Sequence, residues 1–496
     1  MCPPPVTERS EVGSPLRVTV MGLGLFGGGV AVSRYFVERG AQVVVTDLRS
    51  AEELRESVQA LAGLAITFHL GGHREEDFRQ PDIVVANPGV PPDSPYLELA
   101  RAGGARIETE IGLFVHQCPA PVVGVTGSNG KSTTAALTAE VLRSRTKNVW
   151  LAGNIGRSLL GELHQIDAKG WVVLEISSFQ LEYLGETGYS PHVATVTNLS
   201  PNHLDRHATL GRYIAAKQHI LTHQGPRDFA VLNHEDAEVR QWGACTPGTT
   251  LFFSTSGPVP VGCFLEGDRV VATARGVTHR SRQPLRPKLP GKHNVANILA
   301  ALTAGLALDV DLDAGLERAC QFAGLPHRLE FVAEIAGVRY YNDSDATTPE
   351  STLAGLETFS EPIVLIAGGK DKGIDYTEFA RGVARRARAI ILLGTIARRI
   401  AQLIGEQAPG EGAPEVQVVS SLPEAVAEAR RAAAAGEVVL LSPGCSSLDM
   451  FRNFQERGDL FRELVRREAL THGGKVAKPA PAPRAPGLGF EESAET

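Results

Sequence analysis

Residues 122–134 read Val122-Val123-Gly124-Val125-Thr126-Gly127-Ser128-Asn129-Gly130-Lys131-Ser132-Thr133-Thr134, and this stretch decides the fold. An apolar run that predicts a strand enters a glycine-rich loop, and a helical pattern follows the loop. Glycines let backbone N–H groups turn toward a polyphosphate, the lysine supplies a fixed cation, and a serine hydroxyl at the helix N-terminus can bind Mg²⁺. The stretch therefore predicts a nucleoside-triphosphate cradle and phosphoryl transfer; a glycine-rich turn with an incidental lysine is the alternative.

The loop departs at one position from the general P-loop pattern G-x-x-x-x-G-K-[ST]. Val125 stands where that pattern has its first glycine, so the turn begins at Thr126 and Gly127. This departure reduces the number of P-loop classes that the sequence can match.

Length and charge limit the function classes. A chain of 496 residues is too long for one hydrophobic core and predicts about three domains. Its formal charge of −7 is small for this length, which argues against a nucleic-acid groove and a membrane-binding face. The six cysteines include no Cys-x-x-Cys pair, so we expect neither a disulfide framework nor a zinc site. Without a signal peptide or membrane-spanning run, the expected location is the cytoplasm.

Three α/β segments follow one another. Residues 1–109 carry a βαβ pattern, residues 110–323 contain the triphosphate loop, and residues 324–472 again alternate strands with helices. We expect a Rossmann-like N-terminal domain, a central P-loop ATPase-type domain with a parallel sheet, and a C-terminal Rossmann-like α/β domain. Residues 473–496 are rich in Pro, Ala, Gly and Glu, which predicts a disordered tail.

The first segment contains a nucleotide fingerprint. A predicted strand at 16–21 precedes Gly22-Leu23-Gly24-Leu25-Phe26-Gly27, and a second strand ends before Asp47. Asp47 lies about twenty residues after the last glycine, where an acidic residue can bind a ribose hydroxyl, so a dinucleotide is one interpretation. A further strand at 82–86 enters the stiff turn Asn87-Pro88-Gly89, which we expect at the carboxyl edge of the same sheet, where ligands bind.

Two polar residues follow predicted strands of the central segment. Glu175 ends an otherwise apolar run, and a buried carboxylate is unfavourable unless a cation or metal pairs with it. Mg²⁺ held between Glu175, Ser132 and the phosphates would offset that penalty; a carboxylate that reaches solvent is the alternative. His203 follows the strand at 193–199 and is either a metal ligand or a polar loop histidine.

Lys217 lies on the apolar stripe of a predicted helix at 211–221, four residues after Tyr213 and four before Leu221. One interpretation is a side chain that snorkels to solvent. The other is a partly buried amine with a depressed pKa that takes up CO₂ as a carbamate, which would make it an oxygen ligand for Mg²⁺.

The order of motifs along the chain resembles that of the Mur ligase family, and the resemblance covers nearly the whole chain short of the tail. Besides the triphosphate loop, the motifs are residues 153–156, 175–180, 202–205, 216–217, 291–297, 326–328, 342–344 and 442–449. The resemblance implies an ATP-dependent amide ligase that joins D-glutamate to UDP-N-acetylmuramoyl-L-alanine through an acyl phosphate, in peptidoglycan precursor synthesis. It implies small-molecule substrates, no nucleic-acid or membrane partner, and a monomer.

The same resemblance implies roles for individual residues. The catalytic set is Lys131, Glu175, His203 and Lys217. One Mg²⁺ would be bound by Ser132 and Glu175, and a second by His203 and carbamylated Lys217. The ATP-binding set is Gly127, Ser128, Asn129, Gly130, Lys131, Ser132, Thr133, Asn294, Asn297, Arg328 and Asp343. The UDP-substrate set is Leu25, Phe26, Asp47, Arg49, Gly89 and Asn154, so the first fingerprint is interpreted as a UDP site rather than an NAD site. The glutamate set is Thr347, Lys372, Ser447, Leu448 and Phe454.

One position departs from the family pattern. Where the family commonly has Asn-Asp-Ser-Lys-Ala-Thr, this chain has Asp345 in place of the lysine. Carboxylates repel one another, so either Asp345 points away from the incoming amino acid, or Lys370 and Lys372 contribute more of the binding, or the amino acid differs.

Several alternatives stay open. The chain could be a related ligase that uses another amino acid, such as L-glutamate, or a folylpolyglutamate synthase, although the UDP-type first segment argues against the latter. A non-catalytic nucleotide-binding relative is disfavoured because pure binding needs no set of two metal sites. The interpretation as a Rossmann dehydrogenase is supported by residues 22–27 alone. Substrates held by separate domains imply hinge closure, for which residues 322–326 are the expected swivel.

Overall fold

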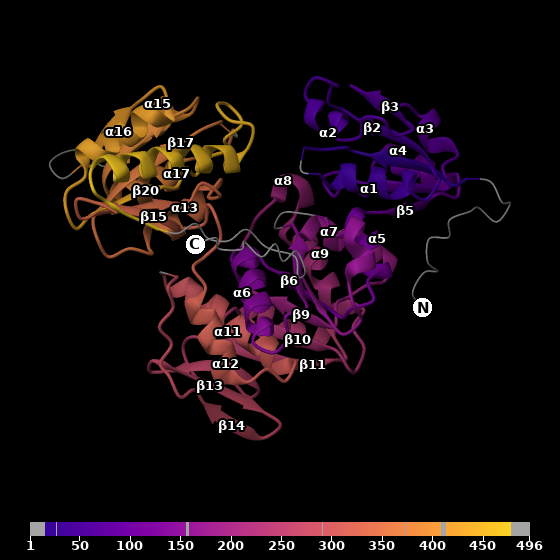
Figure 1. Ribbon diagram of the computed structural model, residues 1–496, viewed down its shortest axis with the longest axis horizontal. Helices are drawn as coiled ribbons and strands as arrows, with labels where there is room; N and C mark the ends of the chain where they lie inside the picture. Colours follow the sequence, from indigo (N-terminus) through magenta and orange to yellow (C-terminus); the bar gives the residue numbers. More distant parts are fainter. Residues whose placement is uncertain are drawn as a thin grey trace, which may run out of the picture. The chain divides into compact units, whose positions relative to one another are not determined.

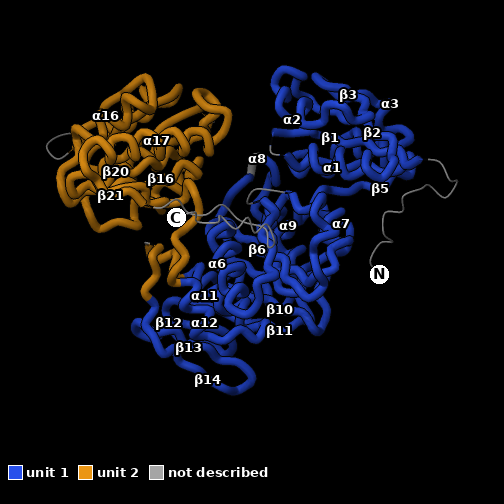
Figure 2. The backbone as a smooth tube through the Cα atoms, viewed as in Figure 1, with its two compact units in different colours: residues 1–285, 296–319, 484–496 blue, residues 286–295, 320–483 orange. Residues whose placement is uncertain are grey.

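The computed structural model describes residues 15–25, 27–154, 158–289, 291–371, 373–407 and 413–477. These residues form three β-sheets with helices packed on them (Figure 1). The chain divides into two compact units (Figure 2). Unit 1 comprises residues 1–285, 296–319 and 484–496, and unit 2 comprises residues 286–295 and 320–483. The first two sheets belong to unit 1 and the third to unit 2.

The first sheet is the predicted Rossmann-like one. Its five strands are all parallel, in the order β3-β2-β1-β4-β5. The strands are β1 (Arg17–Met21), β2 (Gln42–Asp47), β3 (Ile66–Leu70), β4 (Ile83–Ala86) and β5 (Arg106–Glu108), and the helices are α1 (Gly28–Val37), α2 (Arg55–Gln59), α3 (Glu76–Arg79) and α4 (Pro95–Ala102). A Cβ atom on Gly29 would lie 2.3 Å from the Leu23 carbonyl oxygen, so α1 approaches the fingerprint loop closely only because residue 29 lacks a side chain.

The second sheet has nine strands in the order β14-β13-β12-β11-β10-β9-β6-β8-β7. The predicted parallel arrangement holds from β7 to β12, whereas β13 and β14 add an antiparallel hairpin at one edge. The strands are β6 (Val122–Thr126), β7 (Val149–Gly153), β8 (Trp171–Glu175), β9 (Val193–Val196), β10 (Phe229–Asn233), β11 (Thr249–Ser254), β12 (Gly262–Glu266), β13 (Arg269–Ala274) and β14 (Val277–Arg280). The α-helices are α5 (Glu110–Gln117), α6 (Lys131–Arg143), α7 (Ser178–Thr187), α8 (Leu204–His207), α9 (Leu210–Thr222), α10 (Ala237–Gln241), α11 (Lys292–Ala307) and α12 (Leu312–Gln321), and the 3₁₀ helices are η1 (Leu160–Gln165) and η2 (Trp242–Cys245).

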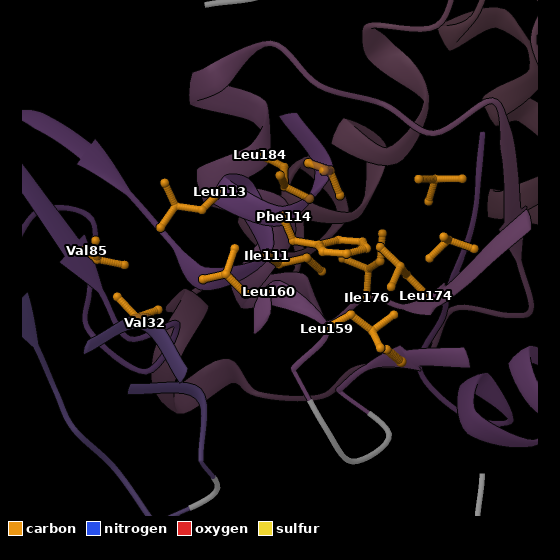
Figure 3. Close-up of a cluster of buried hydrophobic side chains, with 14 of the residues drawn as sticks. Val32, Val85, Ile111, Leu113, Phe114, Leu159, Leu160, Leu174, Ile176 and Leu184 are labelled. Carbon is orange, nitrogen blue, oxygen red and sulfur yellow. The ribbon is translucent and has the colours of Figure 1, made fainter. Parts of the chain in front are cut away.

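One continuous hydrophobic cluster runs through unit 1 from the first sheet to the second. Helix α5 lies in its middle, and its apolar residues are buried among side chains of both parts. Figure 3 labels members of this cluster, from Val32 and Val85 through Ile111 and Phe114 to Leu174 and Leu184. Because burial of apolar area is the main favourable contribution to folding, this shared core explains why both sheets fall into one compact unit.

The third sheet is the predicted C-terminal α/β sheet, with the order β19-β18-β17-β20-β16-β15-β21. Strands β16 to β20 are parallel, and β15 and β21 are antiparallel at one edge. Separate hydrophobic clusters cover its two faces, one with α16 and α17 and the other with α13 to α15. The strands are β15 (Glu330–Ile335), β16 (Val338–Asn342), β17 (Ile363–Gly368), β18 (Ala387–Leu393), β19 (Glu415–Val418), β20 (Val438–Leu441) and β21 (Lys475–Val476). The helices are α13 (Pro349–Leu356), α14 (Thr377–Arg386), α15 (Ala397–Gln407), α16 (Leu422–Ala432) and α17 (Phe454–Thr471).

The start of the predicted tail differs from the expectation. Lys475 and Val476 form β21 and pair with β15, because an open sheet edge offers unpaired N–H and C=O groups to a passing segment. Residues 478–496, which make up the rest of the predicted tail, lie outside the described residues. Within the described part of the chain, no helix combines the length and apolar character needed to cross a membrane.

Candidate active site

The glycine-rich loop follows β6, which is fully buried and lies between β9 and β8 in the second sheet. Helix α6 begins at Lys131, directly after Gly130 in a left-handed conformation. A Cβ atom on Gly127, whose φ is +149°, would lie 1.9 Å from the Thr197 hydroxyl oxygen, and one on Gly130 would lie 2.5 Å from the Asn297 side-chain oxygen. Both positions therefore require glycine, and the loop passes between its neighbours with no room for a side chain.

The end of β9 fixes the loop. The Ser128 and Asn129 N–H groups donate to the Asn198 backbone and side-chain oxygens, each at 2.9 Å, and the Thr197 hydroxyl donates to the Asn129 carbonyl at 2.6 Å. These two N–H groups thus position the loop itself. The N–H groups that begin α6 have no intrahelical acceptors, which is the feature that binds phosphate at helix N-termini.

Lys131 and Ser132 open α6. The Lys131 ammonium donates to the Ser128 carbonyl at 2.9 Å, so the side chain folds back over the loop. Ser132 is buried in the first turn. This arrangement puts a cation and a hydroxyl beside the N-terminus of α6, as the sequence predicts.

Glu175 ends β8, the strand beside β6, and is only 2% exposed. Asn154, at the end of β7, donates its side-chain amide to one carboxylate oxygen at 3.0 Å, whereas the other oxygen is buried and accepts no hydrogen bond. The alternative in which this carboxylate reaches solvent is therefore wrong. A buried carboxylate oxygen without a donor is unfavourable unless a cation binds it, so the position fits a metal ion.

Lys217 is 1% exposed, which excludes the snorkelling interpretation. Its ammonium donates to the Gly127 carbonyl at 2.8 Å and lies 4.6 Å from the centre of the Tyr213 ring. Burial, reinforced by the nearby charge of Lys131, holds the pKa of Lys217 well below its ordinary value, although Glu175 acts in the opposite direction. Because a neutral amine is a nucleophile and an ammonium is not, this environment favours reaction with CO₂.

His203 lies apart from this buried group. It occupies the turn before α8 with φ at +53°, its side chain is exposed, and its ring packs edge-on against Phe179. The structure thus brings Lys131, Glu175 and Lys217 together around the loop and places His203 at the surface on a neighbouring segment. Among the described residues, no three His, Cys, Asp or Glu side chains form a preassembled metal cage.

The predicted UDP residues of the first sheet gather where β1, β2 and β4 end. Asp47 is 4% exposed, and its two carboxylate oxygens accept the N–H groups of Gly24 at 3.1 Å and Arg49 at 2.9 Å. The Gly89 N–H donates to the Asn87 side chain at 3.0 Å, and Leu25 is exposed. Phe26 lies outside the described residues, and Asn154 belongs with Glu175 in the second sheet rather than with this group.

Unit 2 holds Arg328, Asp343 and Asp345. Asp343 is buried and accepts hydrogen bonds from the Ser442 hydroxyl at 2.8 Å and the Leu329 N–H at 3.1 Å. Burial raises the pKa of Asp343 to about 7. The Asp345 carboxylate pairs with the Arg328 guanidinium at 2.5 Å, which agrees with the first of the three possibilities raised for this departure.

The other predicted residues are distributed as follows. Asn294 and Asn297 are both buried on α11, and Asn297 accepts a hydrogen bond from Thr134 of α6 at 3.2 Å. Ser447 is buried, Leu448 is 57% exposed, and the backbone carbonyl of Phe454 accepts a hydrogen bond from Ser344 at 2.7 Å. Lys372 lies outside the described residues.

Sequence reasoning missed three residues that organise the site: Asn198, Tyr213 and Arg457. Arg457 is 2% exposed and donates to the backbone oxygens of Ser344 and Cys445, which ties together two of the predicted motifs. The position of Asn198 at the end of a predicted strand, and of Tyr213 on the stripe of Lys217, were available signals. Nothing in the local pattern around Arg457 indicates its partners, which lie far away in the sequence.

Comparisons with known proteins establish the family of the chain. Family models match three consecutive parts of the chain: a Mur ligase MurD-like N-terminal domain over residues 16–109, a Mur ligase middle domain over residues 125–305, and a Mur ligase glutamate ligase domain over residues 327–445. The chain belongs to the Mur ligase family.

Relatives within this family resemble the chain over most of its length. The UDP-N-acetylmuramoylalanine--D-glutamate ligase of Roseiflexus sp. (strain RS-1) is 44% identical over 465 residues, which cover 90% of this chain and 98% of that protein. The ligase of the same name from Symbiobacterium thermophilum is 42% identical and covers 92% of this chain and 98% of its own length.

Solved Mur ligase structures share the fold. UDP-N-acetylmuramate-alanine ligase MurC from Thermotoga maritima superimposes with a TM-score of 0.58 at 21% identity, covering 91% of this chain and 99% of its own. MurF from Acinetobacter baumannii gives a TM-score of 0.55 at 19% identity, covering 80% and 93%. At such identities the likeness shows a common three-domain architecture and nothing about the substrate.

Proposed function

We propose that this Mur ligase joins D-glutamate to UDP-N-acetylmuramoyl-L-alanine, with cleavage of ATP to ADP and phosphate, in cytoplasmic peptidoglycan precursor synthesis. The observation that carries the proposal is the continuous similarity to ligases named for this reaction, which are 40–44% identical over at least 90% of the chain. The loop with Lys131, Glu175 and Lys217 supplies groups that the chemistry requires.

The first step activates the alanine carboxylate of the UDP-substrate, which is a poor acyl donor. A carboxylate oxygen attacks the γ-phosphorus of ATP, the bond to the bridging oxygen breaks, and ADP leaves. The N–H groups of the first turn of α6 and the Lys131 ammonium bind the phosphates and offset the negative charge that spreads over the transferring group. Catalysis at this step is positioning and electrostatics.

Ser132 and Glu175 beside the loop fit one Mg²⁺, and Asn154 keeps the Glu175 carboxylate oriented. We assign a second ion to carbamylated Lys217 together with His203, which lies on the neighbouring segment apart from Lys217. When bound, these ions supply positive charge to the phosphoryl oxygens. Support comes from the buried Glu175 oxygen without a donor and from the burial of Lys217, whose carbamate would be an anionic oxygen ligand.

The second step forms the amide. The neutral amine of D-glutamate attacks the acyl carbon, phosphate leaves from the tetrahedral intermediate, and the nitrogen loses a proton. We assign the amino acid to Thr347, Lys372, Ser447, Leu448 and Phe454. The pairing of Asp345 with Arg328 supports a pocket in which that carboxylate does not face the substrate.

We assign one substrate to each of the three domains. Residues 1–109 would bind the UDP-substrate through Leu25, Phe26, Asp47, Arg49 and Gly89, with Asn154 from the central domain. Residues 110–323 would bind ATP through the loop, Asn294 and Asn297, and we assign Arg328 and Asp343 to ATP as well. Residues 324–472 would bind the amino acid. The proposed working form is a monomer.

The test is product formation by the purified protein with Mg-ATP, bicarbonate and UDP-N-acetylmuramoyl-L-alanine. ADP and the amide product are measured with D-glutamate, L-glutamate and D-aspartate in parallel. Turnover with D-glutamate alone is the expected result. Turnover with another of these amino acids alone would keep the ligase mechanism and overturn the substrate assignment, and no turnover with any of them would overturn the proposed function.

A further inference from the structure

We infer that Tyr213 is a positioning residue for the nucleotide: its hydroxyl holds Ser128 of the phosphate loop and ties that loop to the helix that carries Lys217. This inference rests on the proposed function for its kinetic readout. Tyr213 belongs to none of the residue sets assigned above, yet it is one of the largest fully buried side chains of unit 1.

The geometry places two tethers one helical turn apart. Tyr213 and Lys217 lie four residues apart on α9 and therefore share one face of that helix. They contact consecutive residues of the loop, because Lys217 donates to the Gly127 carbonyl at 2.8 Å and the Tyr213 hydroxyl lies 3.0 Å from the Ser128 hydroxyl.

The direction of the Tyr213 hydrogen bond follows from the partners of Ser128. The Ser128 hydroxyl donates to the Ser200 carbonyl at 2.8 Å and accepts from the Ser200 N–H at 2.8 Å. A hydroxyl has one proton, and the Ser200 carbonyl can only accept. Tyr213 is consequently the donor, and Ser128 is bound from both the helix and the loop that follows β9.

Neighbouring side chains leave the Tyr213 ring little freedom. Its exposed fraction is 1%, the Lys217 ammonium lies over one face, and the His207 ring lies 5.3 Å away between centroids. His207 is itself held by a hydrogen bond to the Ser178 hydroxyl at 3.0 Å. A ring packed in this way sets the position of its hydroxyl, and hence of Ser128, with little conformational entropy left to lose.

The chemistry proposed for Lys217 weakens its own tether to the loop. The ammonium has three protons with which to donate to the Gly127 carbonyl, whereas the nitrogen of a carbamate keeps only one proton and loses the positive charge that strengthens the hydrogen bond. The Tyr213 hydroxyl is unaffected by the modification. It therefore keeps α9 attached to the loop in both states of Lys217.

The experiment compares Tyr213→Phe, Ser128→Ala and the double variant by the KM for ATP, by kcat, and by calorimetric titration with Mg-ADP. Phenylalanine keeps the ring against Lys217 and removes only the hydrogen bond, whose loss corresponds to a rise of about threefold to tenfold in the KM for ATP and the Kd for ADP. We expect kcat and the KM for the UDP-substrate to change less than about twofold, because no reacting atom touches Tyr213.

Tyr35→Phe is the matched control. Tyr35 is also buried and donates its hydroxyl to a side chain, the Gln117 amide oxygen at 2.6 Å, but it lies on α1. Its loss is expected to leave ATP and ADP binding unchanged.

The double-mutant cycle separates the hydrogen bond from packing. If Tyr213 acts through Ser128, Tyr213→Phe has no further effect in the Ser128→Ala background. Equal effects of Tyr213→Phe in both backgrounds would overturn the inference, as would a Tyr213→Phe variant that binds ADP like the wild type. The titration measures the affinity for Mg-ADP directly, so it tests the role of Tyr213 even if the wild type ligates none of the amino acids. Failure of the proposed function can therefore be told apart from failure of this inference.

Discussion

One carboxylate oxygen of Glu175 is buried and accepts no hydrogen bond. Its negative charge therefore destabilises the fold unless a cation binds it. We expect Glu175→Gln to lower kcat by about 10²- to 10³-fold, the range for removal of one electrostatic group, while the Tm of the metal-free protein stays the same or rises. Steady-state kinetics and thermal unfolding in EDTA measure the two effects.

Glu437 provides the opposite case as a control. It is 8% exposed and accepts two hydrogen bonds from the Arg388 guanidinium, each at 2.7 Å. Glu437→Gln is expected to lower the Tm and leave kcat unchanged, because it breaks a satisfied ion pair between two residues that have no assigned role in the site. A Glu175→Gln variant that lost stability in the same way as Glu437→Gln would show that Glu175 is structural.

Asp343 gives the fold a pH dependence of defined sign. Its folded pKa of about 7 exceeds the ordinary value of 3.8 because of burial, an effect strengthened by Asp345 and opposed by the Ser442 and Leu329 hydrogen bonds and by Arg328. The folded state thus binds the proton more tightly than the unfolded state. The protonated Asp343 thus contributes up to about 4 kcal/mol to the free energy of unfolding. This contribution is fully present below about pH 4 and is lost as the pH rises toward 7.

Asp343→Asn removes this titration while keeping the shape of the side chain. The free energy of unfolding of the variant is expected to fall less steeply than that of the wild type between pH 4 and pH 7 in denaturant titrations. Parallel pH profiles for the two proteins would show that Asp343 is ionised throughout this range.

Asp345 forms an ion pair with Arg328, and this pairing predicts which substrate's binding depends on the Asp345 carboxylate. Asp345→Asn removes this ion pair from Arg328, which is assigned to ATP, so we expect the KM for ATP to change by about twofold to fivefold while the KM for D-glutamate stays within about twofold. A large fall in the KM for D-glutamate alone would show that the carboxylate faces the amino acid after all.

At the scale of elements, the phosphate loop depends on residues that have no side chain. Gly127→Ala would place a methyl group 1.9 Å from the Thr197 hydroxyl at a φ of +149°, so the loop must shift. We expect a stability loss of about 1–3 kcal/mol and at least a tenfold weaker affinity for Mg-ADP. Calorimetric titration and thermal unfolding check both.

Gly161→Ala is the matched control. Gly161 lies in the short helix η1, and nothing lies within 4 Å of a Cβ atom built there. Because an alanine also lowers the conformational entropy of the unfolded chain, this variant is expected to be as stable as the wild type or slightly more so. If both glycine variants bound Mg-ADP normally, the loop would not be the nucleotide site.

Local patterns were enough to predict the elements that carry the site. The apolar run before Gly127 and the stripe that contains Lys217 specify a buried strand and a buried helix face, and both are found as expected. The β13–β14 hairpin and β21 were not predicted, because period and propensity do not say which strands pair or in which direction. Arg457 was missed for a similar reason, because its partners lie far away in the sequence.

At the scale of the whole molecule, the chain passes between its two compact units, within the described residues, at 285–286, 295–296 and 319–320. The expected swivel at residues 322–326 follows the last of these passages. Gly324 lies within it at a φ of +102°, a conformation that side chains disfavour, so this segment is suited to a change of backbone direction.

The proposed reaction predicts that the units move together when ligands bind. Phosphoryl transfer is assigned to the loop of unit 1 and amino-acid binding to unit 2, yet the amine must attack the acyl phosphate at bonding distance. We expect the radius of gyration from small-angle X-ray scattering to fall when a non-hydrolysable ATP analogue and the UDP-substrate are added together, and to fall less with either alone. An unchanged radius with both ligands, at concentrations where calorimetry shows binding, would contradict closure and require the amino acid to reach unit 1 by another route.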